Sequence, residues 1–387
     1  MPLNHIRTII NFLMIFSTIN DNFFVNIAGE ISLKIIITLF IVSNWKSFFT
    51  FISAQTSTKK PFIFLVFFIL LSFFTNYRLY NDWQQPFNIF IAICAIFVVF
   101  SQETDYSKYI WCYILSVVWS CFLCITSKEF IGEFSLRKTG GTGDPNEFSQ
   151  TVLIAIGLIL GYYRTLQKKY KILYGLSYFL FIPAFILAAS KSALLTLTLL
   201  LTIFVVYRLV IDKNTNKRTL IFSITAIALT IIWFLCNFYA ESINLFLLRF
   251  EDTGTAHERL LSWNAGTTLF LQNPCFGIGF SNYVNQIAIN FPQIAEGSRA
   301  AHNMYIQTLV ELGIGGLISY IWLLSVPIYL IIKRKTTNHP IIWGWLAIII
   351  MGNSLSLLGE KYVWIFFAFS YNYNLIHNEN YRNNTSA

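Results

Sequence analysis

The sequence predicts an all-α membrane protein that crosses the bilayer about twelve times. Hydrophobic residues make up 56% of the 387-residue chain and charged residues only 12%, whereas a soluble globular chain carries about 25% charged residues. Apolar runs recur along the whole chain, and many reach the length of about 20 residues that crosses a hydrocarbon core. Low charge and repeated apolar runs together exclude a large soluble helical protein.

The expected spans are separated mostly by short polar loops, and their bounds are defined to within a few residues. They lie near residues 8–20, 31–52, 61–76, 86–100, 109–126, 149–164, 172–190, 192–211, 219–240, 303–332, 340–358 and 361–376. No small-residue cleavage site follows the first run, so it is expected to be a span and not a signal peptide. Asp21 and Asn22 are expected to form the loop after it.

The basic residues predict the orientation of the chain. Cytoplasmic loops are rich in Lys and Arg, and the most basic short loops are residues 164–171, 208–218 and 333–335. Twelve spans place these loops and both termini on one side, where basic residues outnumber acidic ones, while the opposite side has a small acidic excess. The net charge of +9 therefore reflects membrane orientation, and no nucleic-acid partner is expected.

Four domains follow from this arrangement. They are the first nine spans within 1–240, a large outer loop at 241–301, the last three spans within 302–376, and a cytoplasmic tail at 377–387. An outer loop of about 60 residues inside a compact membrane protein is usually functional. Residues 127–148 form the second long outer loop.

The large outer loop is expected to contain an amphipathic helix. The stretch AHERLLSWNAGTTLFLQNP, residues 256–274, has helical spacing of its apolar positions, which are Leu260, Leu261, Thr268 and Leu269. Pro274 is expected to end the helix. Because the helix is too short and too polar to cross the bilayer, we expect it at the outer membrane–water boundary.

Two residues on the outer side suggest proton transfer and phosphate binding. His302 opens the span at 303–332, and a histidine can act as a general base near neutral pH; the alternative is a residue that caps the helix. Arg259 lies in the loop helix, and a guanidinium binds phosphate through paired hydrogen bonds; the alternative is a helix-surface arginine. Trp263 lies one turn from Arg259, so the two can hold the apolar and charged parts of one ligand.

Further basic residues are expected nearby. Arg299 lies just before the span at 303–332, and the alternative is an ordinary loop arginine. Lys191 lies between two apolar runs with almost no loop between them, in LAASKSALL. This pattern predicts a tight outer hairpin that brings the ammonium group close to the loop arginines; the alternative is a lysine that snorkels to the interface. Arg137 and Lys138 are expected to contact an anionic ligand.

Polar residues in the second outer loop predict a helix start. Asp144, Pro145 and Asn146 form a turn in the stretch RKTGGTGDPNEFSQ, residues 137–150, and Asp144 or Asn146 is expected to cap the following helix. The glycines are not followed by the G-K-[ST] pattern of a P-loop, so a nucleotide site is excluded there.

Glu311 is an ionisable residue within a predicted span. Such residues are costly in a membrane and by default indicate function. Asn303, Gln307 and Glu311 are spaced by four residues and therefore form one polar stripe along the helix. The glycines that follow allow close helix approach. The alternative is that Glu311 is a buried hydrogen-bonding residue with a structural role.

The outer loops carry neither a histidine pair typical of metal sites nor the G-x-S-x-G pattern of a serine hydrolase. Their polar residues are mainly basic, with one well-placed histidine. This set suits a phosphate-containing, lipid-linked ligand and chemistry that uses a base. Neither a metal nor another cofactor is expected.

Four stretches of the sequence resemble the O-antigen ligase and polymerase superfamily of bacterial inner-membrane glycosyltransferases. They are GTGDPNEFSQ at 141–150, ASKSALL at 189–195, ERLLSWNAGTTLFLQNPCFGIGFSNY at 258–283 and AHNMYIQTLVELGIGG at 301–316. Their order, spacing and predicted side extend the resemblance from about residue 130 to residue 335. No single stretch is specific, but the four in order are fairly specific together.

The resemblance implies a C-type glycosyltransferase fold and an active site on the periplasmic face. Members take a glycan from an undecaprenyl-pyrophosphate carrier in the inner membrane. Ligases pass it to the lipid A–core of lipopolysaccharide, polymerases pass it to another carrier-linked repeat, and related members pass it to proteins. The transfer inverts the anomeric configuration and uses no metal. The implied partners are this donor, one of these acceptors and membrane lipid.

The resemblance also implies roles for individual residues. The family's loop arginine matches Arg259, which would bind the carrier pyrophosphate, and its histidine matches His302, which would take or orient the proton of the acceptor hydroxyl. The family's second arginine matches Lys191, which keeps the charge but loses the paired hydrogen bonds, and Arg299 is expected to compensate. The residues expected to support the site are Asn303, Glu311, Asp144, Asn146 and Trp263; Glu311 lies about 13 Å deeper along its helix than His302.

The favoured function is therefore that of an O-antigen ligase, with a polymerase as the closest alternative. Transfer to a protein ranks below both. A transporter of lipid-linked glycan is a further alternative, but it does not explain a large outer loop with its own helix. Transporters also often consist of two related halves, which this sequence does not show.

Overall fold

The computed structural model describes residues 3–53, 59–103, 107–128, 137–162, 168–211, 254–333 and 340–371. The regular structure of these residues is helical, which confirms the predicted all-α class. Three helices, Lys108–Thr126, Lys191–Val210 and Met304–Tyr329, are long and apolar enough to cross a membrane, and up to five spans result if each of two bent helix pairs is one span. The described residues therefore belong to a membrane protein with three to five candidate spans, fewer than the twelve predicted.

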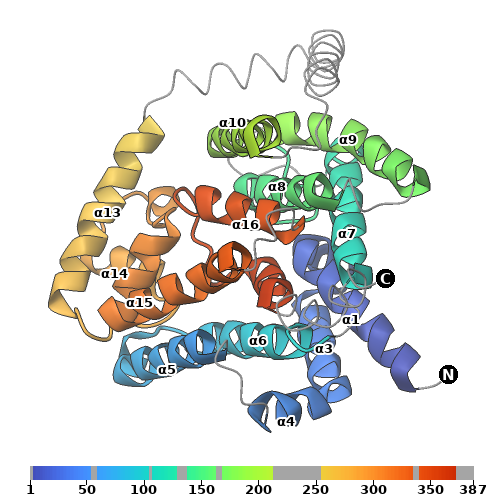
Figure 1. Cartoon of the computed structure of the whole chain (residues 1–387). Helices are drawn as coiled ribbons and strands as arrows, with labels where there is room; N and C mark the ends of the chain where they lie inside the picture. The colour runs from blue at the N-terminus through green and yellow to red at the C-terminus, as the bar shows by residue number, and fades with distance from the viewer. Residues whose placement is uncertain are drawn as a thin grey trace.

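The first half of the chain forms a series of apolar helices, shown from blue to cyan in Figure 1. They are α1 (Leu3–Ile19), α2 (Asp21–Ala28), α3 (Glu30–Ser43), α4 (Trp45–Ser53), α5 (Lys60–Thr75), a 3-10 turn at Tyr77–Leu79, α6 (Gln84–Phe100) and α7 (Ser107–Thr126). Each predicted span in this half is occupied by one of these helices or by the α3–α4 pair.

Two of the predicted spans continue into a second helix after a sharp bend. The loop expected at Asp21 and Asn22 is wrong: these residues begin α2, which turns by 98° from α1. The Asp21 carboxylate accepts the Asn22 N–H at 2.8 Å, as is favourable for an acidic residue at a helix N-terminus. The run at 31–52 is bent by 56° between α3 and α4, next to Asn44, whose side chain donates to the Phe40 carbonyl at 2.9 Å.

The second half continues with α8 (Pro145–Tyr162), α9 (Lys168–Ala188), α10 (Lys191–Val206) and a π-helical turn at Tyr207–Ile211. After the undescribed segment come α13 (Gly254–Gln272), α14 (Tyr283–Asn290), a 3-10 turn at Glu296–Ser298, α15 (Met304–Lys333), α16 (Pro340–Met351) and a last helix at 361–371. The span predicted at 219–240 and the cytoplasmic tail predicted at 377–387 lie outside the described residues.

Small residues allow the helices of the second half to pack closely. A Cβ at Gly157 in α8 would overlap the main chain of Gly344 in α16, and a Cβ at Gly315 in α15 would overlap the ring of Phe68 in α5. Close backbone approach of this kind is typical of helix pairs in membranes. In Figure 1, α8 and α16 lie side by side, and α13 stands across one end of α15.

α15 is interrupted at Gly313, whose φ of 71° breaks the helix. The backbone of residues 274–279 lies against this break, where a Cβ at Gly313 would overlap the Cys275 carbonyl. The N–H of Ile278 donates to the Val310 carbonyl at 3.0 Å and the N–H of Gly279 donates to the Glu311 carbonyl at 3.1 Å. The segment between α13 and α14 thus satisfies carbonyl groups near the break in α15, as buried backbone groups require.

α15 also contains Pro327, which lacks the N–H that would bond the Leu323 carbonyl one turn earlier. The hydroxyl of Tyr371, on the last helix, donates to this carbonyl at 3.0 Å. Tyr371 therefore joins the two helices and satisfies a backbone group inside the core.

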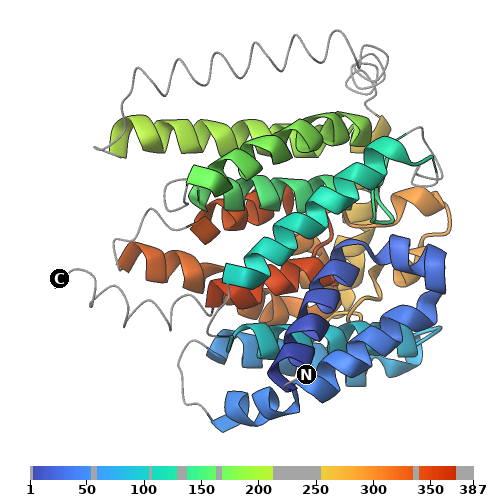
Figure 2. The same cartoon turned by 90° about the vertical axis from the view of Figure 1, so that its right-hand side faces the viewer.

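The connections that were predicted on the outer side gather at one side of the molecule. In Figure 2, the α1–α2 turn, the connection into α8 and an orange segment of the α13–α15 connection lie on the right. Asn22 in the α1–α2 turn donates its main-chain N–H to the Gly141 carbonyl at 3.1 Å. This end of the helices is where the candidate site residues meet.

Candidate functional site

The helix expected in the large outer loop is confirmed as α13, which ends at Gln272, just before Pro274. The residues predicted at helical spacing differ in their burial within the protein. Leu269 is buried, but Leu260 and Leu261 are 52% and 43% exposed. The buried face instead carries small residues, because Ser262, Ala265 and Gly266 pack against the rest of the loop.

α13 is attached to the segment that precedes α15. The Ser262 hydroxyl, which is fully buried, lies 3.1 Å from the Arg299 carbonyl oxygen and 3.3 Å from the Ala300 carbonyl oxygen. One residue further, the indole N–H of Trp263 donates to the Ala301 carbonyl at 2.6 Å. These contacts hold three consecutive carbonyls against α13, so they fix the position of the next residue, His302.

His302 adopts a left-handed backbone conformation, with a φ of +44°. Such values are uncommon outside glycine and mark positions that the surrounding structure holds in place. Its neighbours supply the restraint: the side-chain oxygen of Asn303 accepts the N–H groups of Tyr305 and Ile306, each at 3.0 Å. Asn303 therefore caps α15, and the alternative that His302 is the cap is wrong. The His302 ring is half-buried and has no hydrogen bond to any described residue.

Arg259, His302 and Asp144 interact electrostatically, although they come from α13, the start of α15 and the start of α8. Burial lowers the pKa of His302 below its usual value, the positive charge of Arg259 lowers it further, and the carboxylate of Asp144 opposes both. Burial likewise lowers the pKa of Arg259, and Asp144 again opposes the shift. His302 is consequently neutral at pH 7, which leaves its ring able to accept a proton.

Asp144 is held by the helix that it begins. Its carboxylate accepts the main-chain N–H groups of Asn146 at 2.6 Å and Glu147 at 3.1 Å, so Asp144 is the cap of α8, as was expected of it or Asn146. An acidic N-cap also interacts favourably with the helix dipole. Because the cap fixes the carboxylate, the distance between Asp144 and the two basic residues is fixed by the fold.

Asn146 connects the second outer loop to the α9–α10 hairpin. Its side-chain oxygen accepts from the Arg137 guanidinium at 3.0 Å and from the Ser190 hydroxyl at 2.8 Å. Ser190 also caps α10, and Lys191 is the first residue of that helix. The short connection predicted here is confirmed, since only Ala189, with a φ of +46°, and Ser190 separate the two helices. The helices themselves pack on other partners, α9 on α7 and α8 and α10 on α8 and α16. Lys191 therefore directly follows Ser190, whose hydroxyl is bonded to Asn146 at the start of α8.

Arg299 is bonded within its own loop, and its expected contact with the carrier pyrophosphate stays a prediction. Its side chain donates from Nε to the Ile294 carbonyl at 3.1 Å, and its main chain accepts from Ser262. The Lys138 ammonium likewise donates to a backbone carbonyl, that of Ser127, at 2.6 Å. Both residues are engaged in holding loops, which is a role that their sequence context could not distinguish from ligand binding.

Glu311 is buried and holds the loop after α13. Its carboxylate accepts the N–H of Ser281 at 2.9 Å, the N–H of Tyr283 at 3.2 Å and the side-chain amide of Gln307 at 3.2 Å. This arrangement agrees with the structural alternative for Glu311. The polar stripe of Asn303, Gln307 and Glu311 therefore faces protein, and its two end members position the loop and the helix start that carry His302.

A group of acidic residues beside Asp144 was missed by the sequence analysis. Glu147 and Glu360 interact electrostatically with each other, with Asp144 and with Asp21, and Lys361 supplies one opposing positive charge. Each lies at the end of an apolar run, where a charged residue ordinarily faces the interface. No local spacing links them, so only the tertiary structure reveals the group.

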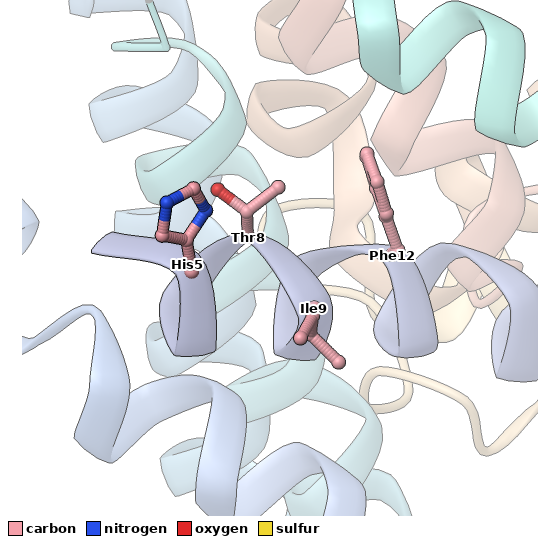
Figure 3. Close-up of a pocket in the computed structure, with 4 residues that line it drawn as sticks. All are labelled: His5, Thr8, Ile9 and Phe12. Carbon is pink, nitrogen blue, oxygen red and sulfur yellow. The ribbon is translucent and has the colours of Figure 1, made fainter. Parts of the chain in front are cut away.

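The described residues contain a separate surface hollow of about 470 Å³ on the first half of α1, lined by His5, Thr8, Ile9 and Phe12. Figure 3 shows His5 and Thr8 beside each other, with Phe12 one turn away. The lining is mostly apolar, and none of the residues discussed above contributes to it. Among the described residues, no three His, Cys, Asp or Glu side chains are arranged to hold a metal ion.

Comparison with known proteins identifies the central part of the chain. Residues 176–321 match the family model described as O-antigen ligase. This range contains Lys191, Arg259 and His302, and three of the four stretches on which the resemblance rests. No curated protein matches the chain. The resemblance is thereby confirmed for residues 176–321, which match the O-antigen ligase model.

Proposed function

We propose that the protein is an O-antigen ligase, which transfers a glycan from undecaprenyl pyrophosphate to the lipid A–core of lipopolysaccharide. The observation that carries the proposal is the electrostatic contact of Arg259, neutral His302 and Asp144 beside the docked helix α13. Two of these three residues lie in the segment of the O-antigen ligase family. The arrangement combines a phosphate-binding cation with a group that can accept a proton.

Arg259 is assigned to the donor. A guanidinium stays protonated in proteins, so burial strengthens its attraction for an anion without removing its charge. Breaking the glycosidic bond to the carrier leaves undecaprenyl pyrophosphate, on which negative charge develops. Arg259 would stabilise this charge in the transition state, with Lys191 as a second cation from the α9–α10 hairpin.

His302 is assigned to the acceptor. The attacking sugar hydroxyl must lose a proton, and a neutral imidazole held in position can accept it. The Trp263 bond and the Asn303 cap hold the main chain on both sides of His302, which has a left-handed backbone conformation. Inversion at the anomeric carbon follows if the hydroxyl attacks from the side opposite the pyrophosphate. Charge stabilisation by side chains alone makes the proposed reaction independent of a metal.

The proposed topology has twelve spans, both termini in the cytoplasm and this site on the periplasmic side of the inner membrane. Contacts between loops support it, because loops predicted on one side bond to one another. Asn81 and Asn285, both on the predicted outer side, are joined at 2.7 Å. Arg7 and Glu103, both on the predicted inner side, form an ion pair. Under this topology α13 caps the outer end of the helices.

Deletion of the gene in its native host, followed by gel electrophoresis of lipopolysaccharide, tests the proposal. A ligase predicts core bands without attached repeats, together with glycan that accumulates on its carrier. Core that bears a single repeat without a ladder would instead identify a polymerase, which shares the same residues. An unchanged ladder would contradict both and would direct attention to protein glycosylation or to transport.

A further inference from the structure

Three buried side chains near the acidic group have polar atoms without a partner in the described residues. They are both amide atoms of Gln150 and the hydroxyls of Tyr113 and Tyr362. Gln150 and Tyr113 are 0% exposed and Tyr362 is 2% exposed. Buried polar groups in native proteins are nearly always hydrogen-bonded, and each exception requires an explanation. Three such side chains in one region indicate a place built to hold a polar molecule.

Tyr362 and Tyr113 lie near the acidic group, and Gln150 shares a helix face with one member of it. The Tyr362 hydroxyl interacts electrostatically with Glu360, Glu147, Tyr113 and Asp144. Gln150 lies three residues after Glu147 in α8, so the two share one face of the helix. The group therefore combines side chains of α7, α8 and the last helix with Glu360, which precedes that helix.

The same group adjoins the proposed reaction site. Asp144 interacts with Glu147, Glu360 and Tyr362 on one side. On the other side it interacts with Arg259 and His302. A molecule bound between the unpaired side chains and Asp144 would consequently lie next to the imidazole of His302. It would approach the imidazole from the side of the acidic residues.

The charges determine what kind of molecule fits. Among the described residues, Lys361 is the positive charge that acts on Glu147 and Glu360, beside the carboxylates of Asp21 and Asp144. Burial and the neighbouring carboxylates raise the pKa of Glu147 well above its usual value and the pKa of Glu360 to about 7. A carboxyl with a raised pKa holds its proton and offers no positive charge to pyrophosphate. An amide, two phenols and carboxyl groups both donate and accept hydrogen bonds, which is the capacity that the hydroxyls of a neutral sugar require.

We propose that Glu147, Gln150, Tyr362 and Glu360 bind the hydroxyl groups of the neutral acceptor sugar and hold its attacking hydroxyl against His302. The inference rests on the proposed function and extends it. It separates the site into a basic part for the carrier pyrophosphate, around Arg259, and an acidic and amide-lined part for the acceptor. Asp144 lies at the boundary between the two parts.

The test uses the purified full-length protein in lipid nanodiscs, carrier-linked glycan from the native host as donor, and lipopolysaccharide without attached repeats as the acceptor probe. Tyr362→Phe and Gln150→Leu remove unpaired polar atoms with little change of shape. Each is expected to raise the acceptor KM about tenfold, equivalent to about 1.4 kcal/mol, while the donor KM stays at the wild-type value. Direct binding of the acceptor probe is expected to weaken by the same factor.

Tyr371→Phe is the matched control, because it removes a buried tyrosine hydroxyl on the same helix that has a protein partner. It is expected to lower the melting temperature and to leave the acceptor KM unchanged. Tyr362→Phe is expected to show the reverse pattern. The two variants therefore separate a structural hydroxyl from one that binds the acceptor.

Three results would overturn the inference. Wild-type acceptor KM in both Tyr362→Phe and Gln150→Leu would mean that solvent satisfies these atoms. A raised donor KM would assign the group to the carrier-linked glycan. Stabilisation of the wild type by Mg²⁺ or Ca²⁺ that is lost in Glu360→Gln, with an unchanged acceptor KM in Tyr362→Phe, would make it a cation site. If the proposed function is wrong, the wild-type protein will transfer no glycan to lipopolysaccharide. That result differs from the three above, and the inference would then be wrong as well.

Discussion

The indole N–H of Trp263 lies 2.6 Å from the carbonyl oxygen of Ala301, and this bond joins the outer loop helix to the residue that precedes His302. Arg259 lies one helical turn before Trp263, on the same helix. The bond therefore sets the relative position of the two residues that are proposed to act on the donor and on the acceptor. Small displacements of such groups reduce catalysis strongly.

Trp263→Phe should lower kcat/KM for glycan transfer by about 10-fold to 100-fold, because the ring remains but the bond to Ala301 is lost. Membrane insertion and the amount of protein should not change. Trp83→Phe is the matched control, since Trp83 is 51% exposed and its ring packs on Phe87. Equal activity of Trp263→Phe and the wild type would show that Ser262 alone positions this segment.

Arg259→Ala should abolish transfer while the protein remains in the membrane, because no other α13 cation would stabilise the pyrophosphate. Arg259→Lys keeps the charge but loses the paired hydrogen bonds, so it should retain a small fraction of the activity. Arg78→Ala, at an exposed position on the predicted outer side, provides the control. Normal transfer by Arg259→Ala in the deletion strain would refute the pyrophosphate role.

Asp144→Asn should shift the acid limb of the pH–rate profile to lower pH. The carboxylate of Asp144 raises the pKa of His302 against the larger effects of burial and Arg259, so its removal lowers that pKa further. The neutral, proton-accepting form of His302 then persists to more acidic pH. Asparagine is as good an N-cap as aspartate, so α8 should keep its start. The measurement is kcat/KM between about pH 5 and 8.

His302→Gln is the control for this pH effect. It should lower kcat/KM by about 100-fold to 10,000-fold, the usual contribution of a general base, and the acid limb assigned to His302 should disappear. An acid limb that stays in His302→Gln, or that moves to higher pH in Asp144→Asn, would assign the ionisation to another group.

The helices were largely predictable from the sequence, but their breaks were not. Apolar runs of the right length indicate helices wherever they occur, and this accounts for α5 to α10. The break in α15 at Gly313 depends on pairing with residues 274–279, which lie about 35 positions earlier in the chain. The turn at Asp21 likewise depends on contact with Gly141. Hydropathy carries no information about such long-range backbone contacts.

In the candidate site, too, single residues were predictable from the sequence and their contacts were not. Arg259 and His302 could be selected individually, as an arginine in a long loop and a histidine at a predicted membrane boundary, although each also has an ordinary alternative role. Their proximity could not be predicted, since it depends on hydrogen bonds of Ser262 and Trp263 to backbone carbonyls. Glu147 and Glu360 were missed because a carboxylate at the end of an apolar run is ordinarily an interfacial residue.

Chelation provides a test of the proposed metal-free mechanism. Activity of the purified protein should be unchanged after incubation with excess EDTA, because Arg259 and Lys191 are proposed to supply the positive charge that a metal supplies elsewhere. The measurement is the initial rate of glycan transfer before and after dialysis against the chelator. Loss of activity that a divalent ion restores would contradict this mechanism and would require oxygen ligands near the pyrophosphate.

Glu311→Gln should lower the stability of the protein by about 1–3 kcal/mol, the cost of a buried hydrogen-bonding group left without its partner. The carboxylate accepts from the N–H groups of Ser281 and Tyr283, and an amide offers one oxygen where the carboxylate offers two. The expected result is a lower melting temperature with an unchanged donor KM. Glu296→Gln, at an exposed position in the same outer loop, should leave the melting temperature unchanged. A raised donor KM in Glu311→Gln at wild-type stability would mean that Glu311 acts on the substrate, and the structural role assigned to it would be wrong.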